Sequence, residues 1–203
     1  MGSSSPSSSP AAAGRSFVSE GARTCHGSTR GGGPRSARTA RVRAGYTPSV
    51  SAPPPPLRLP LEIEDIKKVL PHRYPFLLVD RILELEEDRR VLAVKNVSSD
   101  ERYFIAGPGG RPVLPASILT EAMAQAGAVL ILSKPENRSR LIYFMGIDRV
   151  RYRRPVAAGD TVMLEGTVVR LRGKMGSLKG RALVDGAVVC EGQMTFALGD
   201  RAE

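Results

Sequence analysis

The amino-acid sequence predicts an α+β domain in which an antiparallel β-sheet curls around one buried helix. Residues 116–132 (ASILTEAMAQAGAVLIL) are strongly helix-forming and apolar on nearly all sides, which is typical of a helix inside a protein. About six further segments alternate between apolar and polar residues or are rich in β-branched residues, which indicates strands. Because one helix cannot cover both sides of a flat sheet of that size, a sheet wrapped around the helix is the economical packing.

Two helices follow from spacing and end signals. Residues 61–70 carry apolar side chains at helical spacing and are followed by Pro71, so we expect a short helix there. Pro115 and Ser117 are residue types that favour a helix start, in agreement with the long helix at residues 116–132.

The strands are bounded by turn residues. Asp185-Gly186 is a strong hairpin signal between two alternating segments. Residues 98–112, which contain three glycines, predict a loop, and residues 133–140 predict a polar turn. The expected strands are residues 76–85, 90–97, 141–150, 161–171, 177–184 and 188–198.

By composition, the chain divides into an N-terminal segment, residues 1–56, and a domain, residues 57–203. Residues 1–60 hold eight Arg, no Lys and one acid, and they are rich in Ser, Ala, Gly and Pro. Such a segment cannot bury enough apolar surface to fold alone. Its composition is typical of an organelle transit peptide, and the Ser-rich opening favours a plastid over a mitochondrion; a solvated basic tail is the alternative. Residues 53–56, all Pro, predict a stiff spacer.

Charge and cysteine content exclude several classes of function. The net charge of +10 comes mainly from the N-terminal segment, so we expect no nucleic-acid partner for the folded part. No apolar run approaches the roughly 18 residues of a membrane span. Cys25 and Cys190 fall in different parts of the chain, which excludes a disulfide framework and favours a reducing compartment. We expect Cys190 to be an inert core residue, and we expect no metal and no cofactor.

Glu121 is the residue of the long helix that most suggests chemistry. A carboxylate on an otherwise apolar helix is costly unless it is paired or protonated. Gln125 lies four residues further on and therefore on the same helix face. The alternatives are a Glu121 that faces solvent or a subunit rim, or one that merely bonds to Gln125.

The chain resembles the FabZ-type 3-hydroxyacyl-[acyl-carrier-protein] dehydratases in four blocks: LPHRYPFLLVDRILELE (70–86), GRPVLPASILTEAMAQAG (110–127), RVRYRRPVAAGD (149–160) and VDGAVVCEGQMTF (184–196). The blocks occur in the family's order and spacing, between about residues 59 and 199. The resemblance implies the hotdog fold, a long central helix wrapped by an antiparallel sheet, in a homodimer or trimer of dimers with active sites at the dimer interface. It implies removal of water from 3-hydroxyacyl chains on acyl carrier protein, giving trans-2-enoyl chains in type II fatty acid biosynthesis.

The resemblance assigns the proton transfers to a helix Glu and a loop His. Glu121 matches the helix Glu and is therefore the implied acid. The family's G-H-F-P-G loop aligns without gaps on residues 106–110, which puts Gly107 at the position of the catalytic His. Loss of one general base typically costs about 10²–10⁴ in rate. The remaining histidine of the domain, His72, is a structural residue or a relocated base.

The resemblance also implies a set of substrate-binding residues. Tyr74 matches the tyrosine that gates the acyl tunnel. The N–H groups of Ala116 and Ser117, at the start of the helix, would polarise the thioester with help from the helix dipole. Gln125 completes the implied substrate-binding set.

Four arginines, Arg149, Arg151, Arg153 and Arg154, lie close together in the sequence. Such a patch would steer the docking of an acidic carrier protein, whereas the alternative is an ordinary solvated strand. Two functions stay open on these residues: a dehydratase impaired by the missing loop His, and a non-catalytic hotdog subunit that binds acyl carrier protein or pairs with an active paralogue. Thioester hydrolysis by a lone carboxylate is a third, resting on fold analogy.

Overall fold

The computed structural model describes residues 57–200. The expectations for residues 1–56, namely the transit peptide and the stiff spacer, lie outside the described residues, as does Cys25. The domain expected at residues 57–203 is described apart from its last three residues.

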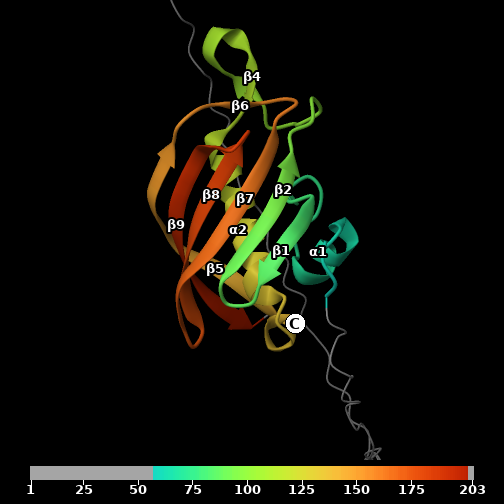
Figure 1. Ribbon diagram of the computed structural model, residues 1–203, viewed down its shortest axis with the longest axis vertical. Coiled ribbons are helices and arrows are strands. Elements are labelled where there is room, and N and C mark those ends of the chain that lie inside the picture. Colours follow the sequence, from blue (N-terminus) through green and yellow to red (C-terminus); the bar gives the residue numbers. More distant parts are fainter. Residues whose placement is uncertain (1–56, 201–203) are drawn as a thin grey trace, which may run out of the picture. The chain divides into compact units, whose positions relative to one another are not determined.

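Within residues 57–200, nine strands form two antiparallel sheets (Figure 1). The larger sheet has six strands in the order β1-β2-β7-β8-β9-β5, and the smaller has the order β3-β4-β6. The strands are β1 Arg81–Glu86, β2 Arg90–Asn96, β3 Ile105–Ala106, β4 Pro112–Leu114, β5 Arg140–Tyr152, β6 Val156–Ala157, β7 Thr161–Arg172, β8 Met175–Val184 and β9 Ala187–Asp200. The predicted antiparallel sheet is confirmed, and β5 forms one of its edges.

The long helix α2 (Ala116–Leu132) has the predicted bounds and packs against all six strands of the larger sheet (Figure 1). Its residues are buried apart from the first two and Glu121. Gly127 allows the sheet to approach closely, because a Cβ at this position would lie 2.6 Å from Leu178 Cδ1 on β8. The predicted α+β packing of one buried helix on a sheet is therefore confirmed. Neither α1 nor α2 is long and apolar enough to cross a membrane.

The short helix α1 (Ile63–Val69) lies within the predicted range and buries Ile66 and Val69. The Arg73 guanidinium donates hydrogen bonds to the carbonyl oxygens of Lys67 and Leu70, at 3.0 and 2.8 Å. These bonds satisfy carbonyls that the end of a helix otherwise leaves unpaired. The segment that follows α1 is thereby tied to the helix.

The strand predicted at residues 76–85 is wrong in its first half, because β1 begins only at Arg81. The peptide groups of residues 76–78 bond instead to the side chain of Gln125, which accepts from Leu78 N at 2.9 Å and donates to the Phe76 carbonyl at 2.7 Å. A tertiary contact has taken the backbone groups that a strand ladder would use. The apolar run that predicted the strand does not show this competition.

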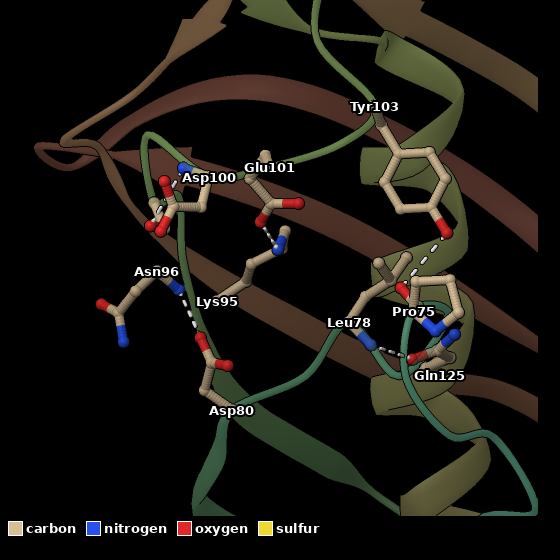
Figure 2. A network of polar contacts seen from close by, with 10 residues as sticks. Pro75, Leu78, Asp80, Lys95, Asn96, Asp100, Glu101, Tyr103 and Gln125 are labelled. Carbon is tan, nitrogen blue, oxygen red and sulfur yellow. Dashed lines mark hydrogen bonds and ion pairs between the residues drawn. The ribbon is translucent and has the colours of Figure 1, made fainter.

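Two further contacts hold the same segment in place (Figure 2). Tyr103 OH donates to the Pro75 carbonyl oxygen at 3.2 Å, and Asn96 N donates to Asp80 Oδ2 at 2.6 Å. Residues 75–80 are therefore held by α2, by β2 and by the loop after β2.

A buried ion pair fixes that loop to the sheet (Figure 2). Lys95 on β2 is 4% exposed, and its Nζ lies 2.5 Å from Glu101 Oε1. A buried charge is tolerated when an opposite charge and a hydrogen bond compensate for lost hydration. The start of the loop at residues 98–112 thus has a defined place.

The rest of this loop is more regular than predicted. It contains β3, a 3₁₀ helix (Pro108–Gly110) and the first residue of β4, which pairs with β6. The other predicted strands are confirmed to within a few residues. The Asp185-Gly186 hairpin is confirmed as well, because both residues have positive φ, 50° and 77°, as a tight primed turn requires.

Candidate functional site

Glu121 interrupts an otherwise buried stretch of α2. Its side chain is 28% exposed, and its Oε1 accepts a hydrogen bond from Gln125 Nε2 at 2.8 Å. The prediction that Glu121 and Gln125 share one helix face is confirmed. Glu121 is therefore a half-buried carboxylate with one oxygen fixed by a neighbour.

Gln125 is 1% exposed and bridges α2 to the segment before β1 (Figure 2). Its amide nitrogen donates to both Glu121 and the Phe76 carbonyl, and its oxygen accepts from Leu78 N. Both amide hydrogens are therefore used inside the protein. In the described residues, Gln125 positions Glu121; its predicted contact with substrate stays a prediction.

His72 is brought to Glu121 by the segment that Arg73 ties to α1. His72 Nε2 lies 3.8 Å from Glu121 Oε1, and its Nδ1 is buried with no hydrogen-bond partner among the described residues. The imidazole ring also lies beside Phe76, with ring centroids 6.0 Å apart. A buried polar atom without a partner is rare and calls for an explanation. The one sequence feature that singles out His72 is that it is the only histidine outside the N-terminal segment.

Glu121 and His72 face a cavity of about 200 Å³. This volume is well above the roughly 10–15 Å³ that one water molecule needs. The walls are mainly apolar and include Phe76, Leu132 and Phe144. Small-molecule sites typically combine apolar walls with a few convergent polar groups. The cavity can therefore hold apolar atoms beside a carboxylate and an imidazole.

Gly107 does not line this cavity, and neither does any other residue of the described loop 98–112. The loop closes on itself there: Gly107 N donates to the Arg111 carbonyl at 2.8 Å, and Gly110 N donates to the Gly107 carbonyl at 3.0 Å. A Cβ at position 107 would lie 2.6 and 2.8 Å from the two Val113 methyl groups and 2.9 Å from the Arg111 oxygen. The backbone here is shaped for a residue without a side chain.

The other expected substrate-binding residues are spread around α2. Ala116 and Ser117 are its first two residues, so their N–H groups have no acceptor within the helix. Ser117, Glu121 and Gln125 follow at four-residue intervals and form one stripe along the helix. Tyr74 is 87% exposed and forms no part of the cavity wall.

The arginines predicted to form a docking patch separate into two kinds. Arg149 and Arg151 line a groove of about 220 Å³ together with Lys179. Arg153 instead forms an ion pair with Glu191. The Arg153 hydrogen bond, helped by the charges of Arg151 and Lys179, lowers the pKa of Glu191.

Arg154 and Cys190 have structural contacts. The Arg154 guanidinium donates to the Val184 carbonyl at 3.3 Å. Cys190 is fully buried, and burial raises the pKa of its thiol to about 11. The prediction of an inert core cysteine is therefore confirmed for burial, since reactivity requires a thiolate.

Comparisons with known proteins agree with this arrangement. Residues 70–193 match the FabA-like domain. Over 143 residues the chain is 49% identical to the 3-hydroxyacyl-[acyl-carrier-protein] dehydratase FabZ of Bacillus cereus (strain AH820), which covers 70% of this chain and 99% of the relative. The FabZ of Geobacillus sp. (strain WCH70) is 50% identical over 141 residues, covering 70% and 97%.

The solved structures agree on the fold. The dehydratase heterocomplex ApeI:P from Xenorhabdus doucetiae is similar with a TM-score of 0.58 at 22% identity, covering 67% of this chain and 91% of that chain. Cj0977, a virulence protein from Campylobacter jejuni, is similar with a TM-score of 0.53 at 18% identity, covering 71% and 97%. The chain therefore belongs to the FabA-like domain family, as a hotdog-fold protein of the FabZ 3-hydroxyacyl-[acyl-carrier-protein] dehydratase type.

Proposed function

We propose that this protein is a 3-hydroxyacyl-[acyl-carrier-protein] dehydratase of type II fatty acid biosynthesis, forming trans-2-enoyl chains. The observation that supports it most is the Glu121 carboxyl group beside a mainly apolar cavity of about 200 Å³. Dehydration of a 3-hydroxyacyl thioester needs a base for the C2 proton, an acid for the departing C3 hydroxyl and donors for the thioester oxygen. The cavity suits the alkyl chain, and Glu121 is the acid.

The start of α2 supplies the third requirement. The N–H groups of Ala116 and Ser117 are unpaired within the helix and carry the positive end of its dipole. Negative charge that builds on the thioester oxygen is stabilised there. In this proposal Tyr74 stands at the entrance, where its exposed ring is free to cover an incoming acyl chain.

The groove between Arg149 and Arg151 is the proposed contact for acyl carrier protein. Both arginines are exposed, and Lys179 adds a third positive charge to the same groove. Charge complementarity accelerates encounter with an acidic partner. Arg153 and Arg154 contribute less in this proposal, because the first is neutralised by Glu191 and the second bonds to a backbone carbonyl.

A homodimer formed through the β5 edge belongs to the same proposal, alone or within a trimer of dimers. β5 ends the larger sheet, and its Tyr143, Met145 and Ile147 are between 46% and 64% exposed. An unpaired apolar edge strand favours pairing with another chain. We expect light scattering to give twice or six times the monomer mass, and Met145→Lys to reduce it.

For residues 1–56 we propose a plastid transit peptide, with a mitochondrion as the alternative destination. The support is composition: many Arg and Ser and a single acid. Residues 1–60 fused to a fluorescent protein are expected to enter plastids of plant cells. Mitochondrial fluorescence selects the alternative, and diffuse cytosolic fluorescence contradicts a targeting role.

The test of the enzymatic proposal is the hydration of crotonyl-[acyl-carrier-protein] by the full chain, followed as loss of enoyl absorbance. We expect turnover that Glu121→Gln abolishes and that Glu136→Gln leaves unchanged, because Glu136 is exposed and lies outside the cavity. Equal rates for the parent and Glu121→Gln contradict the dehydratase and favour the non-catalytic subunit. Release of free carrier thiol without hydration indicates thioester hydrolysis instead.

A further inference from the structure

The described residues contain a second titratable group at the cavity, and the loop at residues 98–112 supplies none. Of the described residues that line the cavity, only Glu121 and His72 have ionisable side chains. The surrounding residues from α2, β5 and the end of α1 are apolar or, in Gln125, a neutral amide. A reaction that needs both a base and an acid at this cavity therefore has one candidate for each.

The geometry keeps His72 near Glu121 without joining them. Their Nε2 and Oε1 atoms are 3.8 Å apart, which is beyond hydrogen-bond distance but within reach of a proton transfer through a small shift. Gln125 occupies Glu121 Oε1, whereas Oε2 accepts no hydrogen bond from the described residues. His72 Nδ1 is likewise unpartnered and buried. Glu121 and His72 therefore each keep a side-chain atom that forms no hydrogen bond within the described residues.

The backbone around His72 is held firmly. Arg73 donates to the carbonyls of Leu70 and His72 at 2.8 and 2.7 Å, and the imidazole ring contacts Phe76. A catalytic side chain must be held close to the productive geometry by its neighbours. Arg73 and Phe76, which both follow His72 in the sequence, provide that support.

We propose that His72 is the catalytic base of this enzyme, acting with Glu121 as the acid; the inference rests on the dehydratase function proposed above. His72 Nε2 takes the C2 proton, and the C2–H electron pair forms the C2–C3 double bond. Protonated Glu121 gives its proton to the C3 hydroxyl, which leaves as water. The imidazolium then returns its proton to the Glu121 carboxylate across the short gap, so both groups are restored without any further reactant.

The test uses the full chain in the crotonyl-carrier hydration assay. We expect His72→Gln and His72→Ala to lose about 10²–10⁴ in kcat, as removal of a general base does. The matched control is His26→Gln, which changes the other histidine of the chain and is expected to keep the parent rate. Thermal unfolding midpoints equal to that of the parent show that a loss of rate is not a loss of fold.

Chemical rescue separates a base from a structural histidine. We expect added imidazole to restore part of the His72→Ala rate, more strongly with more basic azoles, and to leave Glu121→Gln inactive. A His72→Ala variant that is folded and inactive but not rescued by any azole overturns the proposal. A His72→Gln variant with the parent rate also overturns it. In that case, loss of activity in Glu121→Gln still supports the dehydratase. A parent no faster than Glu121→Gln refutes the dehydratase itself, and His72 as its base with it.

Discussion

Substitution of Gly107 by any larger residue is expected to destabilise the loop between β3 and β4. The backbone at Gly107 has φ −99° and ψ −169°, which any residue can adopt, so conformation alone would favour alanine. At such positions Gly→Ala typically stabilises by about 0.4–1 kcal/mol through the unfolded chain. The outcome is therefore decided by space and not by backbone strain.

There is no room for a side chain at Gly107. The added Cβ would meet two Val113 methyl groups at 2.6 and 2.8 Å and the Arg111 carbonyl oxygen at 2.9 Å. Valine has a stiff χ1 and the carbonyl is part of the backbone, so neither neighbour yields cheaply. Overpacking of this kind typically costs about 1–3 kcal/mol. The gain through the unfolded chain offsets part of this cost. Gly107→Ala is therefore expected to lower the free energy of unfolding by roughly 0.5–2.5 kcal/mol.

The assay is thermal unfolding of the full chain, with Gly107→Ala, Val113→Ala and the double variant. For a domain of this size the expected loss lowers the midpoint by roughly 1–10 °C. Because Val113→Ala removes the methyl groups that cause the clash, the two changes should couple favourably by about 0.5–3 kcal/mol. An unchanged or higher midpoint for Gly107→Ala, together with purely additive effects, refutes the reasoning.

The same contacts bear on placing a histidine at position 107, where the resemblance implies the loop histidine. We expect Gly107→His alone to lower the unfolding midpoint more than Gly107→Ala does, and to add no hydration activity. In the Val113→Ala background the larger side chain gains room, so much of the loss in unfolding midpoint should be recovered there, still without added activity because Gly107 does not line the cavity. Full activity of Gly107→His in the otherwise unchanged chain contradicts this expectation.

Three further outcomes are expected. Glu101→Ala strands the buried Lys95 charge and should cost about 3–5 kcal/mol in denaturant unfolding; Lys95→Met/Glu101→Leu should recover most of it, and failure to recover contradicts an electrostatic origin. Gln125→Leu leaves peptide groups at residues 76–78 unpaired, at about 1–3 kcal/mol each, and lowers hydration activity because Glu121 loses its support. The raised pKa of Cys190, about 11 against an ordinary 9.0, keeps its proton on in the folded state, so stability is full below pH 9 and falls by roughly 2–3 kcal/mol as pH rises to 11. In Cys190→Val the free energy of unfolding should lose this part of its decrease between pH 9 and pH 11, because no thiol is left to ionise.

Much of the architecture could be predicted because it depends on local pattern. The run at residues 116–132 is apolar on nearly all sides, and a helix with that composition has to be buried, so α2 was predicted with the bounds it has. Asp185-Gly186 fixed the β8–β9 hairpin through its need for positive φ. The helical spacing also placed Glu121 and Gln125 on one face.

What failed to follow from the sequence depends on contacts between distant segments. Residues 76–79 form an apolar run like that of a buried strand, yet Gln125 bonds to the peptide groups of Phe76 and Leu78, and no local pattern reveals a partner that lies 47 residues away. The short strands β3 and β4 exist because β4 pairs with β6, and the partners Val113 and Ala157 are 44 residues apart in the chain. Such pairings are decided by the assembled fold.

The sequence by itself determined the fold class, the buried helix and which carboxylate is the candidate for catalysis, since residue type and spacing are local properties. Only the tertiary structure decided what surrounds that carboxylate. It brought His72 to 3.8 Å from Glu121 across 49 residues of chain, left the imidazole Nδ1 without a partner, and closed the loop at Gly107 too tightly for a side chain. The physical reason is that burial, clash and an unpaired polar atom are properties of packed neighbours, which a linear pattern does not contain.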